Sequence, residues 1–103
     1  MTYEDLQDRP TRAVPLVGIS ADKLITNQPC ILVGWSVRDA GAAASLFDLY
    51  DGQDETGSIV AGGAYASGGE SRSDLGGEGV WCERGLWLDV ESGTLQGAVW
   101  IKR

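Results

Sequence analysis

The clearest pattern of apolar and polar positions lies at the carboxyl end of the chain, in residues 80–103. Apolar residues alternate with polar ones on both sides of Ser92 and Gly93, and strict alternation is typical of strands that bury one face. With Ser92-Gly93 as a two-residue turn, the flanking strands would form a hairpin. In that register Leu86 faces Val99 and Val90 faces Leu95, so that the aliphatic residues share one buried face.

The second face of this predicted hairpin carries two tryptophans. The same register places Trp87 opposite Ala98, with Trp100 diagonal to Trp87 and within reach of its ring. The neighbours on this face include the charged residues Asp89, Glu91 and Lys102. A face that is partly apolar but not part of the core is more often covered by another subunit than left in water. We therefore expect Trp87 and Trp100 to belong to an interface.

Upstream of this stretch, short runs of β-forming residues are separated by turn-forming ones. We expect strands at residues 16–20, 23–26, 30–38, 44–50, 58–66, 70–75 and 80–82. In the longest run the odd positions are all apolar, which predicts that Trp35 lies in the core. The alanines of residues 39–50 favour a helix, but the β pattern on both sides favours a strand.

That strand has apolar groups on both sides, with Phe47 and Leu49 on one and Leu46 and Tyr50 on the other. A strand covered on both faces fits a central position or a contact with another subunit. Leu46 and Tyr50 are therefore candidate interface residues, together with the two tryptophans.

About eight short strands with turns between them predict an all-β domain, an antiparallel β-sandwich or jelly roll, over residues 15–103. Residues 1–14 are polar, contain Pro10 and show no period. They are predicted to form an extended arm, which either frays as a terminus or lies along a neighbouring subunit.

The acidic composition narrows the range of partners. The chain has a net charge of −7, and its eight lysines and arginines are dispersed. Nucleic-acid binding requires a basic surface, so a nucleic-acid partner is excluded. No apolar run approaches the ~18 residues of a membrane span, and the amino terminus does not resemble a signal peptide. We expect the protein to be made in the cytoplasm and to stay there until it is assembled.

The residues needed for common catalytic and zinc sites are missing. The chain has no histidine and only two cysteines, Cys30 and Cys82. This excludes a Ser-His-Asp or Cys-His arrangement and leaves zinc without a tetrahedral set of ligands. The cysteines fit small buried hydrophobic residues, with a disulfide between adjacent strands as the alternative.

One acidic turn is the remaining candidate for chemistry. Asp51, Asp54 and Glu55 are clustered there, and paired carboxylates serve as acid and base in some hydrolases, or as oxygen ligands for Ca²⁺. The run lacks the ligand spacing of an EF-hand, and turns are where solvated acids ordinarily lie. We predict no catalytic residues, no metal and no cofactor.

Several runs resemble a family. They are ILVGWSVR at 31–38, LYDG at 49–52, GLWLDV at 85–90 followed by Ser92-Gly93, and GAVW at 97–100. Together they resemble small β-rich proteins encoded among the virion structural genes of tailed phages of actinobacteria. The resemblance covers about residues 30–102, and the amino-terminal arm lies outside it.

The resemblance implies a non-enzymatic virion component, such as a capsid decoration or minor head protein, and it supplies no catalytic residues. We expect a homotrimer that binds the major capsid protein on the outer surface of the head. The alternative is a carbohydrate- or receptor-binding module of a phage tail, in which exposed Trp87 and Trp100 stack on a sugar ring.

Overall fold

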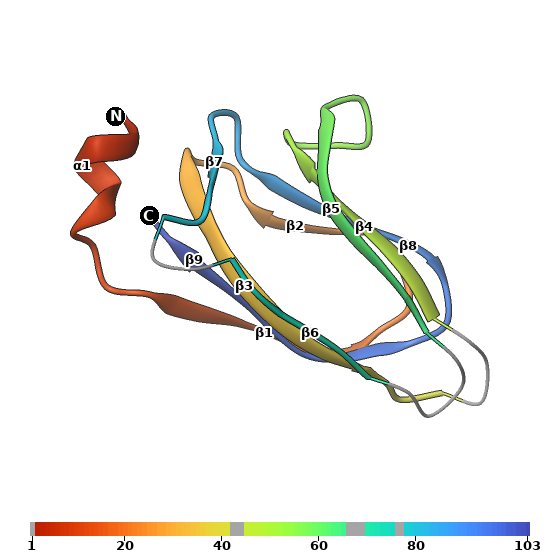
Figure 1. Cartoon of the computed structure of the whole chain (residues 1–103). Helices are drawn as coiled ribbons and strands as arrows, with labels where there is room; N and C mark the ends of the chain where they lie inside the picture. Colours follow the sequence, from red (N-terminus) through yellow and green to blue (C-terminus); the bar gives the residue numbers. More distant parts are fainter. Residues whose placement is uncertain (1, 42–44, 66–69, 76–77) are drawn as a thin grey trace.

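The computed structural model describes residues 2–41, 45–65, 70–75 and 78–103. In these residues one short helix precedes nine strands (Figure 1). The elements are α1 (Tyr3–Gln7), β1 (Arg12–Ile19), β2 (Lys23–Thr26), β3 (Cys30–Asp39), β4 (Ser45–Asp51), β5 (Ser58–Tyr65), β6 (Glu70–Asp74), β7 (Val80–Cys82), β8 (Leu86–Ser92) and β9 (Leu95–Lys102). The strand predicted for residues 44–50 is confirmed where the chain is described; residues 44 and 66, at the ends of two predicted strands, lie outside the described part.

The strands form two antiparallel sheets that face each other, as Figure 1 shows. One sheet has the order β1-β9-β3-β6, and β7 also pairs with β3. Strand β7 pairs with residues 30–32 and β6 with residues 34–38, so the two short strands follow each other along β3. The other sheet has the order β2-β8-β4-β5. The predicted all-β sandwich is therefore confirmed.

The pairing shows how the chain is wound. Five ladders share one property: β1–β9, β2–β8, β3–β7, β3–β6 and β4–β5. In each, the residue numbers of two facing residues add up to nearly the same value, from 108 (Gly34 with Asp74) to 114 (Ile19 with Leu95). The first half of the chain thus pairs with the second half as one long ribbon. Successive parts of the ribbon alternate between the two sheets, which is the winding of a jelly roll with two Greek keys.

The hairpin predicted for residues 80–103 is wrong. Strands β8 and β9 lie in different sheets, joined by a turn in which Gly93 has a φ of +82°. The buried face was predicted correctly for Leu86, Leu88, Leu95 and Val99, which are buried, while Val90 is half-buried and packs against the core. Alternation determines which residues a strand buries, but a strand can bury that face against an opposite sheet whichever strand lies beside it.

The core fills the space between the sheets. Trp35 from β3 is only 6% exposed and packs edge-to-face against Phe47 of β4, with 6.1 Å between ring centroids, as expected for a core tryptophan. Cys30 and Cys82 face each other across the β3–β7 ladder as fully buried free thiols. They serve as small apolar residues, which confirms that prediction.

The amino-terminal segment is not an extended arm throughout. Thr2 and Asp5 form a capping box at the start of α1, and Leu6 of this helix is fully buried. The Tyr3 hydroxyl donates a hydrogen bond of 2.6 Å to the Glu78 carbonyl, and Lys102 Nζ donates one of 2.9 Å to the Gln7 carbonyl. Strand β1 begins at Arg12, three residues before the predicted domain boundary at residue 15. Among the described residues, no helix has the length and apolar character needed to cross a membrane.

Candidate functional site

The outer face of the β2-β8-β4-β5 sheet carries a row of apolar side chains that crosses all four strands. Leu24 faces Trp87, Trp87 faces Tyr50, and Tyr50 faces Ile59. Residues that face each other in an antiparallel ladder project from the same side of the sheet. Leu24 is 39% exposed and Ile59 is 59% exposed, while Trp87 and Tyr50 are half-buried. We call these four residues the apolar row.

Three of the four predicted interface residues share this face. Leu46 is half-buried and lies on β4 with the same parity as Tyr50, which in turn faces Trp87. Trp100 does not join them, because it belongs to β9 in the other sheet, where it faces Ala13 and Gly34. The predicted pairing of the Trp87 and Trp100 rings is therefore wrong, and with it a sugar platform built from both.

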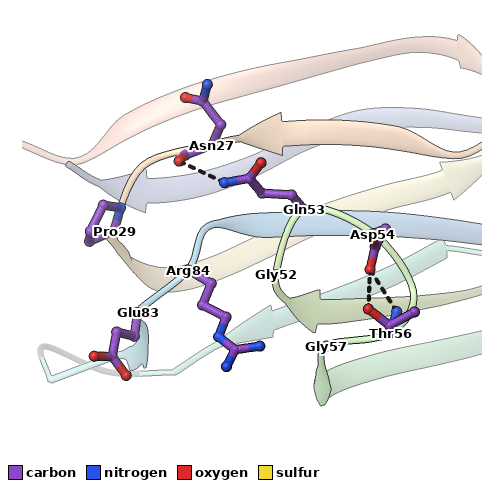
Figure 2. A pocket seen from close by; sticks show the side chains of 9 residues that line it. All are labelled: Asn27, Pro29, Gly52, Gln53, Asp54, Thr56, Gly57, Glu83 and Arg84. Atoms are coloured by element: carbon purple, nitrogen blue, oxygen red, sulfur yellow. Dashed lines mark hydrogen bonds between the residues drawn. The ribbon is translucent and has the colours of Figure 1, made fainter.

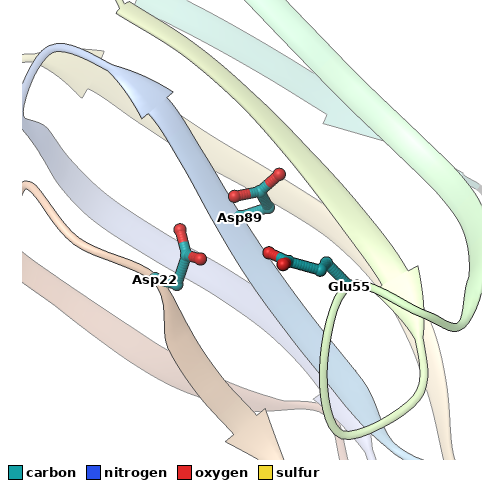
Figure 3. Close-up of side chains that lie close together, drawn as sticks. All are labelled: Asp22, Glu55 and Asp89. Atoms are coloured by element: carbon teal, nitrogen blue, oxygen red, sulfur yellow. The ribbon is translucent and has the colours of Figure 1, made fainter.

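Five carboxylates adjoin the apolar row, and we call them the acidic cluster: Asp22, Asp48, Glu55, Asp89 and Glu91. Asp48 faces Asp89 across the β4–β8 ladder. Carboxylate oxygens of Asp22, Glu55 and Asp89 lie within 4.8 Å of one another, and so do those of Asp48, Asp89 and Glu91. Figure 3 shows Glu55 reaching from the loop after β4 toward the two aspartates over β8. The cluster thus lies on the same outer face as the row.

The close approach of these carboxylates raises the pKa of several groups on this face. Burial, a hydrogen bond with Asp22 and the charges of Asp22, Glu55 and Glu91 raise the pKa of Asp89 to about 6. A hydrogen bond with Asp48 raises the pKa of Glu91. Burial and then the charges of neighbouring carboxylates, Asp48 first, also raise the pKa of Tyr50. Asp48 lies two residues from Tyr50 on the same face of β4, so the acidic cluster adjoins the apolar row.

The structure separates the three carboxylates of the acidic turn. Asp51 accepts hydrogen bonds from the backbone N–H groups of Glu83 and Arg84, at 3.2 and 2.9 Å. Asp54 accepts hydrogen bonds from the hydroxyl and backbone N–H of Thr56, which lower its pKa and make it a weak base. In the part of the chain that the structure describes, Glu55 is the one acid of this turn that joins other acids, so the turn forms no carboxylate pair. The oxygen atoms around Glu55 and Asp89 are of the kind that hard cations such as Ca²⁺ prefer.

An open hollow of about 440 Å³ lies beside this turn, where three loops meet (Figure 2). It is lined by Asn27, Pro29, Gly52, Gln53, Asp54, Thr56, Gly57, Glu83 and Arg84. Gln53 Nε2 donates a hydrogen bond of 3.5 Å to the Asn27 carbonyl across it. The lining is mostly polar, whereas small-molecule sites are predominantly apolar and enclosed. The apolar row is therefore the better candidate for a functional surface.

Sequence reasoning missed most of this surface. Leu24 and Ile59 are isolated apolar residues in the sequence, and they can be recognised as part of this surface only once the strand pairing places them beside Trp87 and Tyr50. The acids come from separate strands and loops. Parity along one strand had placed only Asp89 and Glu91 of the acidic cluster beside Trp87.

Comparison with known proteins gives no assignment. No family model, no curated protein and no solved structure matches the chain. The resemblance to virion proteins of actinobacterial phages stays a prediction, and inference about function rests on the outer face of the β2-β8-β4-β5 sheet.

Proposed function

We propose that this chain is a non-enzymatic virion structural protein, a capsid decoration protein of a tailed phage that binds the major capsid protein on the outer surface of the head. The contact is made by the outer face of the β2-β8-β4-β5 sheet. The observation that carries this proposal is the apolar row, a continuous line of side chains across four strands. Such a line is more typical of a covered surface than scattered apolar residues are.

The composition of the row suits protein binding. Aromatic residues are enriched at interfaces, and Trp and Tyr are frequent among the residues that contribute most to affinity. Trp87 and Tyr50 lie at the centre of the row, flanked by the more exposed Leu24 and Ile59. All four lie on strands, so their backbone does not have to be ordered when a partner covers them.

We also propose a homotrimer, for whose contacts between copies a second surface is available. Trp100 is half-buried on the outer face of the opposite sheet. In a cyclic trimer two different patches of each subunit meet, so the surface around Trp100 would contact a second patch on the neighbouring copy while the apolar row contacts the shell. Contacts repeated over many copies on a shell raise the overall avidity without any new kind of contact.

The test uses heads of the phage that encodes this chain, prepared without it. Purified protein is expected to cosediment with these heads, and Leu24→Ser together with Ile59→Ser should weaken binding. From exposed fractions of 39% and 59%, the lost burial amounts to about 2 kcal/mol, or roughly 10- to 100-fold in affinity. Val17→Ser is the matched control, because Val17 is 75% exposed on the other sheet.

Two results would overturn the proposal. One is a protein that does not bind the heads at all. The other is equal weakening by Val17→Ser, which would show that the row is not the contact. Binding to host cells that is lost on Trp87→Ala, without binding to heads, would favour the carbohydrate- or receptor-binding module instead.

A further inference from the structure

The acidic cluster has a fixed position relative to the apolar row. Asp89 lies two residues from Trp87 on β8, and Asp48 lies two residues from Tyr50 on β4. Side chains two residues apart along a strand are on the same face, about 7 Å apart. Asp48 and Asp89 face each other, as Tyr50 and Trp87 do, so an acidic line runs parallel to the apolar line.

The carboxylates of this line are held together against their mutual repulsion. Asp22 is anchored by the backbone N–H of Val90, which donates a hydrogen bond of 2.9 Å to it. Glu55 is brought over the same strand by its loop (Figure 3). The charges that raise the pKa of Asp89 are all carboxylates, namely Asp22, Glu55 and Glu91. Such an arrangement costs free energy in the isolated protein and favours the binding of positive charge.

We propose that the outer face of the β2-β8-β4-β5 sheet binds a basic segment of a partner protein, whose lysine or arginine groups enter the acidic cluster while neighbouring apolar side chains cover the apolar row. The inference rests on the proposed function and specifies the chemistry of the capsid surface. An extended segment that runs along the strands places residues i and i+2 on the same face, about 7 Å apart, so a basic residue at i and an apolar residue at i+2 match the two lines.

The same charges argue against a second copy as the occupant. Two copies that met through this face would bring their acidic clusters together, and like charges placed opposite each other across an interface are strongly unfavourable. Contacts between copies in a homotrimer therefore use another surface, such as the sheet that carries Trp100.

The first arm of the test measures binding to decoration-free heads at two salt concentrations. The cluster variant is Asp48→Asn, Asp89→Asn and Glu91→Gln. The control variant is Glu4→Gln, Glu78→Gln and Glu83→Gln, which removes the same charge from exposed sites elsewhere. The cluster variant should bind at least tenfold more weakly at low salt and lose the salt dependence of the wild type, while the control stays within about threefold. Equal weakening by both variants, or none by the cluster variant, would overturn the inference.

The second arm does not depend on heads, so that failure of the inference can be told apart from failure of the proposed function. An eight-residue peptide with lysine and leucine in turn at its odd positions and serine at its even positions is titrated into the ¹⁵N-labelled protein; the control peptide has glutamate in place of lysine. The lysine peptide, but not the glutamate peptide, is expected to shift amide signals in β2, β4 and β8. These shifts should be lost in the cluster variant. Shifts spread over both sheets, or shifts that persist in the cluster variant, would overturn the inference.

Two further measurements address the other occupants of this face. Calcium chloride at millimolar concentration should leave the amide spectrum of the cluster unchanged; saturable shifts there would identify a cation site instead. Sedimentation equilibrium should show any self-association to be the same for the wild type and the cluster variant. If the cluster variant associates with itself more strongly or more weakly than the wild type does, a second copy is the occupant.

Discussion

Gly97 offers the sharpest test of how the sheets are paired. It lies on β9, where it faces Leu16 on one side and Val37 on the other. Its φ is +145°, and a Cβ at this position would lie 2.0 Å from the Ser36 carbonyl oxygen and 3.0 Å from the Val37 Cα. Both are backbone atoms of β3, so they can move only if the two strands separate.

We expect Gly97→Ala to lower the free energy of unfolding by roughly 3 to 5 kcal/mol. The strained backbone contributes about 1 to 3 kcal/mol, and each ladder hydrogen bond lost by separation of β9 from β3 adds about 1 kcal/mol. Gly18→Ala is the matched control, because Gly18 has a φ of +59° and no atom within 4 Å of the added Cβ. Its cost should be the left-handed backbone alone, about 1 to 2 kcal/mol.

Urea denaturation followed by tryptophan fluorescence measures both values. A domain of this size has a stability of about 5 to 15 kcal/mol, so Gly97→Ala should remove a large part of it. In the hairpin register Gly97 would face Leu88, far from Ser36, and the two variants would cost about the same. A Gly97→Ala variant no less stable than Gly18→Ala would therefore refute the pairing of β9 with β3.

Four further predictions follow from described contacts. At pH values above 7, Asp89→Asn should raise Tm, because the pKa of Asp89 is raised to about 6 in the folded protein and ionisation of this carboxyl therefore lowers stability. The gain in Tm should fade as the pH is lowered from 6 to 4, and a gain that stays constant would contradict this cause. Trp87→Phe should change stability by less than about 1 kcal/mol, because the buried Trp87 Nε1 has no acceptor among the described residues; a larger loss in urea denaturation would reveal one. Cys30 and Cys82 should not react with Ellman's reagent at pH 8 until the protein is unfolded, because a hydrogen bond with the Cys30 thiol and burial raise the pKa of Cys82; rapid reaction of the native protein would show that the pair is accessible. Leu6→Ala should lower the free energy of unfolding by about 2 to 5 kcal/mol in the same denaturation assay, whereas a frayed terminus would show no change.

The sequence predicted which face of each strand is buried far better than it predicted which strands pair with each other. Period-two alternation identifies Leu86, Leu88 and Val99 as buried wherever their strands are placed, and they are buried. Pairing depends on residues far away in the chain, since β8 lies beside β2 and β4 rather than beside β9. The Ser92-Gly93 turn is compatible with a hairpin and with a crossing between sheets, so local signals could not decide between them.

The candidate site shows the same limit. Parity along single strands correctly grouped Leu46 with Tyr50 and placed Trp87 outside the core. Trp100 was assigned to the same surface only because the hairpin was assumed. The acidic cluster depends on Asp22 and Glu55, which are brought to Asp89 by the fold. Helix α1 escaped notice because five residues are too few to show a helical period.

The folded-over ribbon also governs how this protein acquires its structure. Arg12 pairs with Ile101, near the two ends of the chain, whereas Asp51 and Ser58 pair at the closed end of the ribbon. Ladders between sequence-distant residues carry a large loop-closure cost, which makes folding slow, on the order of milliseconds to seconds. The turn between β4 and β5 is the natural place for nucleation, and pairing then spreads outward toward both termini. Strand β1 is synthesised before its partner β9, so the sandwich can be completed only after β9 has left the ribosome.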